Sequence, residues 1–404
     1  MRRSSGGRMK VVVSRCLLGE ACRYDGEARP CEAVRQMRDA FDVVGVCPET
    51  EGGLASPRPP AERRDGRVVL EDGTDVTVEF ARGAQAALRR AFTADAGLAV
   101  LKAKSPSCGS GCIYDGSFTG TLVPGDGVCA ELMKGEGICV VDENMVTKCK
   151  PTMEHPVALV LGSGLGALAN DVKPVRRIDY HDIPGFPEDA TPVEGHRFEA
   201  TIGTVDGVPV VVYPGRVHLY QGYGASEVTA LVRHAHRLGC RDIVFACATG
   251  AIPGKAEMGL GLITDQINLT GTNPLVDQQD LCDVDSPFVG MTDAYTPYLT
   301  AIARGVAADQ GITLGEGVYA GMLGPNFETA AENAALGALG VSYVGVSTVL
   351  EVIMAHALGM NVLGLTLAAN MAGDASVTHE TVLEAAETYA DDFEDLVRGV
   401  LTKL

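Results

Sequence analysis

The sequence predicts two α/β domains in one chain, a small domain with a parallel sheet followed by a larger domain, joined near Asp142–Pro156. Short apolar runs alternate with helical patterns in both halves, as is typical of buried strands in α/β proteins. Charge divides unevenly: the first 150 residues hold 21 basic and 21 acidic side chains, so the whole net charge of −19 lies in the rest. Nine of the 12 cysteines precede residue 151. Two domains of different chemistry are therefore expected.

Composition excludes several classes of protein. With 46% apolar and 21% charged residues the chain is globular, and no run approaches the ~20 apolar residues of a membrane helix. The basic start, Met1–Lys10, precedes an apolar run too short for a signal peptide. We expect a soluble, cytoplasmic protein with no membrane partner. The acidic second half argues against nucleic acid as a partner, because phosphate backbones bind basic surfaces.

Three apolar runs of the first half are each followed closely by a cysteine. The pairs are Lys10–Ser14 with Cys16, Phe41–Val46 with Cys47, and Leu98–Lys102 with Cys108. Because the carboxyl ends of parallel strands meet at one edge of a sheet, these thiols are expected to converge. A helical pattern at Ala84–Phe92 precedes the last run. The first 150 residues contain neither histidine nor a Cys-x-x-Cys pair, which disfavours a zinc site. Spacing alone leaves free buried thiols as an equal alternative.

The segments around these cysteines carry a family resemblance. They are Val13–Gly19, Cys22–Gly26, Cys47–Glu49, Gly52–Leu54, Pro57–Glu62, Lys104–Gly109 and Ile113–Gly116. Over residues 9–143 the chain resembles the thiouracil desulfurase family. The resemblance implies a [4Fe–4S] cluster held by Cys16, Cys47 and Cys108, with one iron open to a substrate sulfur. It also makes Glu49 and Ser105 candidate proton donors. Cys22 stays open as a neighbouring or alternative ligand.

Apolar runs of the second half lead into polar groups suited to an anion or a purine. Val157–Leu161 leads to Ser163, Val208–Tyr213 to Arg216, His218 and Tyr220, Asp242–Ala246 to Cys247–Gly250, Tyr343–Val346 to Ser347, and Val362–Ala369 to Asn370. Hydroxyls, a guanidinium, an imidazole and glycine-rich backbone N–H groups together favour a phosphate cradle. Gly162, Gly164, Ala167 and Asp182 also fit a dinucleotide fingerprint. That interpretation is disfavoured because Asn170–His181 contains a proline and no apolar run.

A second resemblance covers about residues 156–402, in a domain expected to span 154–404. The segments that carry it are Gly162–Gly166, Ile183–Pro187, Gly195–His196, Gly215–Tyr220, Gly324–Thr329, Gly345–Val349 and Ala369–Asn370. They resemble the trimeric class of purine nucleoside phosphorylases. The resemblance implies a central mixed sheet and phosphate-dependent cleavage of purine ribonucleosides or deoxyribonucleosides, giving the base and (deoxy)ribose 1-phosphate for purine salvage.

The resemblance also implies roles for single residues. Phosphate, the co-substrate, would be held by Ser163, Arg216, His218, the Ala248 backbone N–H and Ser347. The nucleoside would lie against His196, Tyr220, Phe327, Glu328, Val346, Asn370 and His379, with Tyr220 and His379 on the ribose and Phe327, Glu328 and Asn370 on the base. Asn370, Glu328 and His218 would be the catalytic groups. The expected assembly is a homotrimer in which Phe288 of one chain closes a neighbour's pocket. This half is expected to need no metal.

Three departures from the resembled family bear on the site. Cys247–Ala251 stands in place of Asn-Ala-Ala-Gly-Gly, and Val346 replaces a common Met. Gln221 replaces a Glu, so a carboxylate that would orient Arg216 is expected to be missing. Two alternative functions stay open, a methylthioadenosine phosphorylase and a non-catalytic Fe–S sensor fused to a nucleoside-binding domain. An acid at Asn370 would favour the first, and loss of Arg216 or Glu328 the second.

Overall fold

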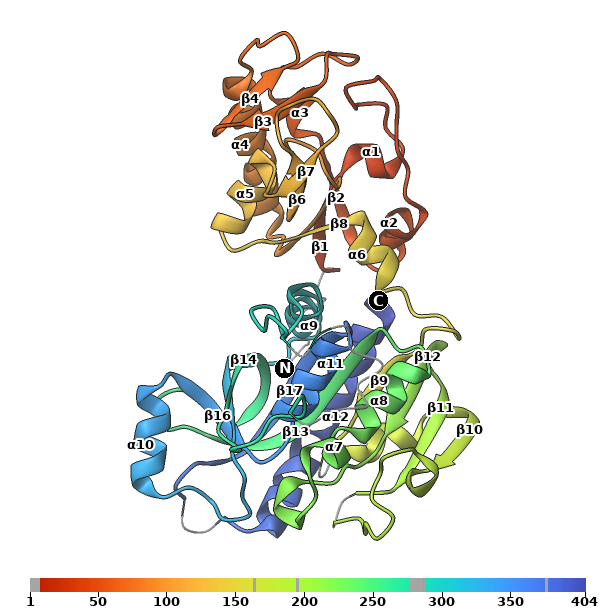
Figure 1. The fold of residues 1–404 in the computed structure, drawn as a ribbon, viewed down its shortest axis with the longest axis vertical. Helices are drawn as coiled ribbons and strands as arrows, with labels where there is room; N and C mark the ends of the chain where they lie inside the picture. The colour runs from red at the N-terminus through yellow and green to blue at the C-terminus, as the bar shows by residue number, and fades with distance from the viewer. Residues whose placement is uncertain (1–7, 163–164, 194–195, 277–285, 287, 375–376) are drawn as a thin grey trace. The chain divides into compact units, whose positions relative to one another are not determined.

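The computed structural model describes residues 8–162, 165–193, 196–276, 286, 288–374 and 377–404. The chain divides into two compact units, one holding Met1–Lys150 and the other Pro151–Thr402 (Figure 1). Each unit has its own sheet and its own core. Among the described residues, no helix is both long and apolar enough to cross a membrane.

The first unit is built on a four-stranded sheet of order β2-β1-β5-β8. Its strands are β1 (Lys10–Ser14), β2 (Asp42–Val46), β5 (Leu98–Leu101) and β8 (Cys139–Asp142). All three pairings are parallel, which confirms the predicted parallel sheet. The central strands β1 and β5 are buried almost throughout, because apolar residues occupy nearly every position and helices cover both faces of such a sheet.

Helices follow the strands of this unit, and Cys16 lies in the first of them, whereas Cys108 lies in a turn. The helices are α1 (Arg15–Leu18), α2 (Glu32–Gln36), η1 (Met37–Asp39), α3 (Pro48–Glu51), α4 (Thr77–Ala94), α5 (Val128–Gly135) and α6 (Glu143–Lys148), and the two hairpins are β3 (Ala61–Arg64) with β4 (Arg67–Leu70) and β6 (Cys112–Tyr114) with β7 (Leu122–Pro124). Cys47 is the N-cap of α3, where Pro48 suits the first helical position. The helix predicted at Ala84–Phe92 is longer, because α4 buries a stripe that starts at Phe80.

The second unit contains a nine-stranded mixed sheet of order β10-β11-β12-β9-β13-β16-β15-β14-β17, with β13 and β17 also paired. Its strands are β9 (Val157–Val160), β10 (Lys173–Asp179), β11 (Glu199–Val205), β12 (Val208–Tyr213), β13 (Asp242–Ala251), β14 (Gly259–Asn268), β15 (Gly315–Gly321), β16 (Val341–Gly345) and β17 (Asn361–Met371). Strands β12, β9, β13 and β17 run parallel to one another, so their carboxyl ends lie at one edge. The mixed sheet predicted from the resemblance is confirmed.

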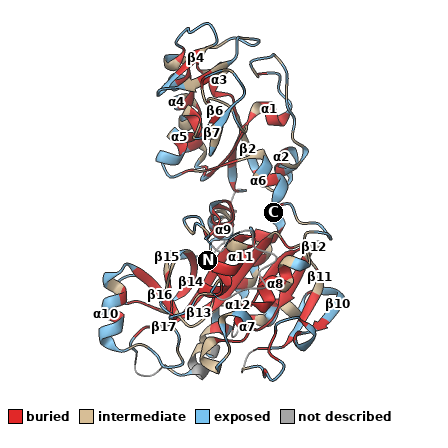
Figure 2. Cartoon of the chain, in the orientation of Figure 1, coloured by how far each residue is buried: buried red, intermediate tan, exposed pale blue. Residues whose placement is uncertain are grey.

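Nine helices accompany this sheet in the part of the second unit that the structure describes. They are η2 (Gly166–Asn170), η3 (Tyr180–Asp182), η4 (Leu219–Gln221), α7 (Ala225–Val228), α8 (Ala230–Arg237), α9 (Pro297–Gln310), α10 (Ala330–Ala338), α11 (Val349–Ala357) and α12 (His379–Lys403). Figure 2 shows the central strands and α11 buried and the edge strand β10 largely exposed. Seven of the nine residues of α11 are buried, because its sequence is apolar on all sides except at Glu351 and His356.

Strands β13 and β17 extend past the ends predicted at Ala246 and Ala369. They pair with each other along their full length, so Cys247–Ala251 belongs to a strand and not to a loop. A register shift between Thr249 and Gly250 skips Ala369 and sets Gly250 opposite Asn370. Such bulges turn side chains to a new direction. This one lies where the predicted anion-binding and base-binding segments meet.

Candidate active site

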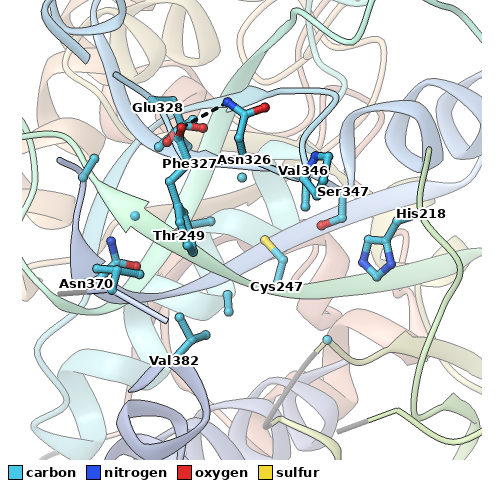
Figure 3. Close-up of a pocket in the computed structure, with 18 of the residues that line it drawn as sticks. His218, Cys247, Thr249, Asn326, Phe327, Glu328, Val346, Ser347, Asn370 and Val382 are labelled. Carbon is cyan, nitrogen blue, oxygen red and sulfur yellow. Dashed lines mark hydrogen bonds between the residues drawn. The ribbon is translucent and has the colours of Figure 1, made fainter. Parts of the chain in front are cut away.

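A cavity of about 540 Å³ lies at the carboxyl ends of β9, β13 and β17. Ligands of open α/β sheets bind at this edge. The cavity brings together ten of the predicted residues, namely His196, Arg216, His218, Tyr220, Ala248, Phe327, Glu328, Val346, Ser347 and Asn370. In Figure 3, His218 and Ser347 lie on one side of the pocket, Asn370 lies on the other, and Glu328 lies beside Phe327.

Arg216 is the fixed cation of the anion-binding side. The residue is only 1% exposed. Its Nη1 donates to Glu351 Oε2 at 2.8 Å, and its Nη2 donates to the carbonyls of Val160 (3.2 Å) and Ala246. The expectation that Arg216 lacks an orienting carboxylate is therefore wrong. Glu351, in the first turn of α11, supplies that carboxylate from a position 135 residues further along the chain.

Gln221 orients His218 instead. Its Oε1 accepts from the backbone N–H of His218 at 2.8 Å and lies 3.3 Å from His218 Nδ1. The imidazole is further held by rings on both sides, with centroid distances of 5.5 Å to His196 and 4.9 Å to Tyr220. The backbone N–H of Arg216 donates to His196 Nδ1 at 3.1 Å. The stacked rings and this hydrogen bond together connect the His218 imidazole to the backbone of Arg216 and hold the ring at the cavity wall.

Ser347 lies in a strained turn at the start of α11. The N–H of Val349 donates to the Ser347 carbonyl at 2.8 Å across a single residue, Thr348, which has φ 70° and ψ −49°. This is a γ-turn, and a β-branched residue rarely adopts it. The Tyr319 hydroxyl lies 3.0 Å from the Ser347 carbonyl and 3.2 Å from its nitrogen. Ser347 is thus held on both sides at the cavity.

The opposite side of the cavity offers a carboxyl, an amide and an aromatic ring. Burial raises the pKa of Glu328 above the ordinary value of a glutamate, and the negative charge of Glu332 adds to that rise. Asn370 Nδ2 donates to the Met371 carbonyl at 3.0 Å, which leaves its oxygen and one N–H for a ligand. Phe327 is 56% exposed. These groups are of the kinds expected to contact a flat base with polar edges.

Three predicted residues are not placed in this cavity. Ser163 lies outside the described residues, and so does the side chain of His379, whose backbone begins α12. Phe288 is 94% exposed and does not line the cavity of its own chain.

Sequence reasoning missed Glu351 and Thr249. Thr348 and Glu351 form a capping box, S/T-x-x-E, directly after Ser347. That pattern marks the start of a helix, and it is the signal by which Glu351 could have been found. Thr249 lines the cavity and lies 2.7 Å from Thr366 Oγ1, so it puts a hydroxyl where the resembled family has an alanine.

A separate cavity of about 390 Å³ lies in the first unit and gathers the predicted thiols. Cys16, Cys22, Cys47 and Cys108 all line it, and each is 6–8% exposed. A hydrogen bond with Cys16 and burial raise the pKa of Cys22 to about 11. Burial also raises the pKa of the Cys108 thiol. Among the described residues no three His, Cys, Asp or Glu side chains are arranged around a single metal ion. Four thiols spread around a cavity suit a larger, thiolate-bound group.

Glu49 and Ser105 lie in the same cavity and contact each other. Ser105 Oγ donates to Glu49 Oε1 at 3.3 Å and accepts from the backbone N–H of Cys108 at 3.1 Å. Arg58 binds the other carboxylate oxygen of Glu49 through Nη2 and through Nε at 3.0 Å. Arg58 also donates to the Cys22 carbonyl at 3.3 Å. The arginine therefore fixes the carboxylate beside the thiols.

Fold and site together are typical of an α/β enzyme, with groups suited to an anion and a heterocyclic base at the carboxyl edge of its larger sheet. A family model for the phosphorylase superfamily matches residues 156–402, and one for 2-thiouracil desulfurase matches residues 11–145. Both resemblances inferred from the sequence are confirmed.

Curated relatives and solved structures agree with the larger match. Purine nucleoside phosphorylase 1 of Bacillus subtilis is 38% identical over 251 residues, which are 61% of this chain and 92% of that protein. The Mycobacterium tuberculosis purine nucleoside phosphorylase is 37% identical over 256 residues, 62% of this chain and 90% of that protein. The Schistosoma mansoni enzyme in complex with adenosine has a TM-score of 0.57 and 31% identity over 62% of this chain and 92% of its own. The chain belongs to the phosphorylase superfamily, among its purine nucleoside phosphorylases, which are pentosyltransferases.

Proposed function

We propose that the second unit cleaves 6-oxopurine nucleosides with inorganic phosphate, giving the free base and ribose or deoxyribose 1-phosphate. One observation supports this most: Arg216, His218 and Ser347 line the same cavity as Glu328 and Asn370. The solved relatives from Schistosoma were captured with adenosine, hypoxanthine and guanosine, and isoform 2 with cytosine and ribose-1-phosphate.

Phosphate would act as both nucleophile and counter-charge. Arg216, His218, Ser347 and the Ala248 backbone N–H would hold it beneath the sugar, with Ser163 beside them. A phosphate oxygen then forms a bond to the anomeric carbon as the bond from that carbon to the purine breaks. The positive charge that develops on the sugar is stabilised by the fixed anion.

Glu328 and Asn370 would stabilise the departing purine. The electron pair of the broken bond goes to the purine, which gathers negative charge. An ionised Glu328 can accept the N1–H of a 6-oxopurine, and Asn370 can donate to N7 or O6. Since the second contact strengthens as the bond breaks, Asn370 contributes to rate and not to binding alone. Tyr220 and His379 would contact the ribose, and His196, Phe327 and Val346 would shape the pocket.

The active assembly would be a homotrimer. Phe288 is almost fully exposed in a single chain. We assign it to the pocket of a neighbouring chain, where it would cover the sugar and exclude water.

The base preference tests the purine assignment. At saturating phosphate, inosine and guanosine should be cleaved faster than adenosine or methylthioadenosine, because Glu328 and Asn370 match a 6-oxopurine. Asn370→Asp should shift the preference toward 6-aminopurines, since the new carboxylate accepts from an exocyclic amine. Faster cleavage of adenosine or methylthioadenosine by the unaltered protein would contradict the assignment.

The first unit would remove sulfur from a thiolated base or nucleoside by hydrolysis, with water consumed and sulfide released. Cys16, Cys47 and Cys108 would hold a [4Fe–4S] cluster, and Cys22 lies close enough to contact the same group. When bound, the cluster would supply an iron that takes up a soft sulfur atom. Glu49, fixed by Arg58, and Ser105 would hold and pass the proton at the thiocarbonyl.

Anaerobic desulfurisation tests this second role. Iron- and sulfide-loaded protein is offered a thiouracil, a thiopurine and a thionucleoside, and loss of thiocarbonyl absorbance is followed together with sulfide release. At least one compound should react, and Cys108→Ala should abolish the reaction. Equal activity of Cys108→Ala, or no reaction at all in loaded protein, would leave the cavity a structural or sensory site.

A further inference from the structure

We propose that Glu351 is a positioning residue for phosphate, setting the arginine and the serine of the anion site relative to each other. The inference rests on the proposed function, in which Arg216 and Ser347 bind phosphate. It concerns a carboxylate that would not itself touch the anion. Glu351 is 0% exposed and lies in the first turn of α11, four residues after Ser347.

One carboxylate oxygen makes both connections. Glu351 Oε2 accepts from Arg216 Nη1 at 2.8 Å and from the backbone N–H of Thr348 at 2.9 Å. The first contact fixes the guanidinium and the second fixes the residue next to Ser347. The other oxygen, Oε1, is buried without a hydrogen-bond partner among the described residues. All the hydrogen bonds found for this carboxylate therefore serve the two groups of the anion site.

The turn at Thr348 has an unfavourable backbone conformation, and Glu351 helps to stabilise it. Thr348 has a positive φ of 70°, is 1% exposed, and places its Oγ1 3.0 Å from Ser347 Oγ and 3.5 Å from Arg216 Nη1. Strained backbone persists only where surrounding contacts fix it. Glu351 supplies such a contact, and the strained conformation keeps the Ser347 hydroxyl at the wall of the cavity.

The burial of Arg216 also indicates that Glu351 orients the guanidinium and does not compete with phosphate for it. Arg216 is buried, and a buried cation without a partner is costly to the fold. Its two terminal nitrogens already donate to Glu351, Val160 and Ala246, so the guanidinium is held in one orientation before any ligand binds. Because the Arg216 side chain is already held in one orientation, it loses little conformational entropy when phosphate binds.

The test compares Glu351→Gln, Thr348→Gly and the control Glu316→Gln. Glu316 also pairs with an arginine, Arg304, but that pair is exposed. Glu351→Gln should raise the KM for inorganic phosphate about tenfold or more, since misplaced binding groups cost on that order, and leave the KM for inosine within about threefold. The melting-temperature increase produced by phosphate should shrink, while the increase produced by hypoxanthine should persist. Glu316→Gln should change neither.

Thr348→Gly keeps the test decisive if Glu351→Gln does not fold. Glycine suits φ 70° and keeps the backbone N–H that Glu351 accepts, so this variant should fold, yet it frees the turn and should also raise the phosphate KM. An unchanged or lowered phosphate KM in folded Glu351→Gln would overturn the inference, the lowered value because Glu351 would then compete with phosphate. If only Thr348→Gly folds, an unchanged phosphate KM in that variant would overturn it. Lack of phosphate-dependent cleavage in the unaltered protein would instead refute the proposed function.

Discussion

At the scale of single residues, the ionisation of Glu328 links the site to pH. Burial and the nearby charge of Glu332 raise the pKa of Glu328. The carboxylate must be ionised to accept a purine N–H. As pH falls through this raised pKa, the group takes up a proton and the proposed contact with the base is lost. The site therefore loses affinity at a higher pH than an exposed glutamate would allow.

We predict that the KM for inosine rises as pH falls from 8 toward 5. Glu328→Gln should have a high KM at every pH, without this rise at low pH. Steady-state kinetics across the pH range measure both. Glu332→Gln removes a negative charge close to Glu328 and should therefore move this rise in KM to lower pH. The same rise in KM at low pH in Glu328→Gln would mean that another group titrates.

At the scale of elements, two helices of the first unit approach so closely that only glycine fits. A Cβ on Gly83 of α4 would lie 1.7 Å from the Pro48 carbonyl oxygen, and one on Gly52 would lie 2.1 Å from the Glu79 carbonyl oxygen. Helix α3 follows Cys47 and contains Glu49. This close contact therefore fixes the position of a predicted cluster ligand and a predicted proton donor.

Gly83→Ala should destabilise the first unit by at least the ~1–3 kcal/mol typical of overpacking, and displace α3. Iron content and desulfurisation should fall, while phosphorolysis of inosine stays unchanged. Gly135→Ala in α5 is the matched control, because nothing lies within 4 Å of its added Cβ. Normal iron content in Gly83→Ala would show that α3 does not need this contact.

The elements differ in how far the sequence predicts them. The runs at Lys10–Ser14 and Val208–Tyr213 coincide with β1 and β12, because short apolar runs rich in β-branched valine favour a buried strand over a helix. The sequence predicts the end of β13 too early, since Cys247–Gly250 has the composition of a loop and is recognised as strand only from its pairing with β17. Arg216 and His218 follow a strand end and could be predicted. Glu351 could not be placed by spacing, because its contact with Arg216 joins distant segments.

At the scale of the whole molecule, each unit has its own sheet, core and cavity. The described residues that line the phosphorylase cavity all belong to the second unit. The two activities should therefore be separable.

A variant with Cys16, Cys47 and Cys108 all changed to serine should keep full phosphorolysis and lose the proposed desulfurisation. Arg216→Ala should do the reverse, with phosphorolysis reduced on the order of a hundredfold or more because a charge-assisted contact in a desolvated site is lost. Rates of both reactions in the three proteins provide the comparison. Loss of phosphorolysis on mere removal of iron would contradict separable units.

The central claim is that this chain uses phosphate to cleave purine nucleosides, and product analysis with inosine tests it most directly. The purified full-length chain is incubated with inosine, with and without inorganic phosphate, and the products are identified and quantified. We predict hypoxanthine and ribose 1-phosphate in equal amounts, and no cleavage when phosphate is left out. Hypoxanthine released at the same rate without phosphate, or free ribose in place of ribose 1-phosphate, would contradict the account.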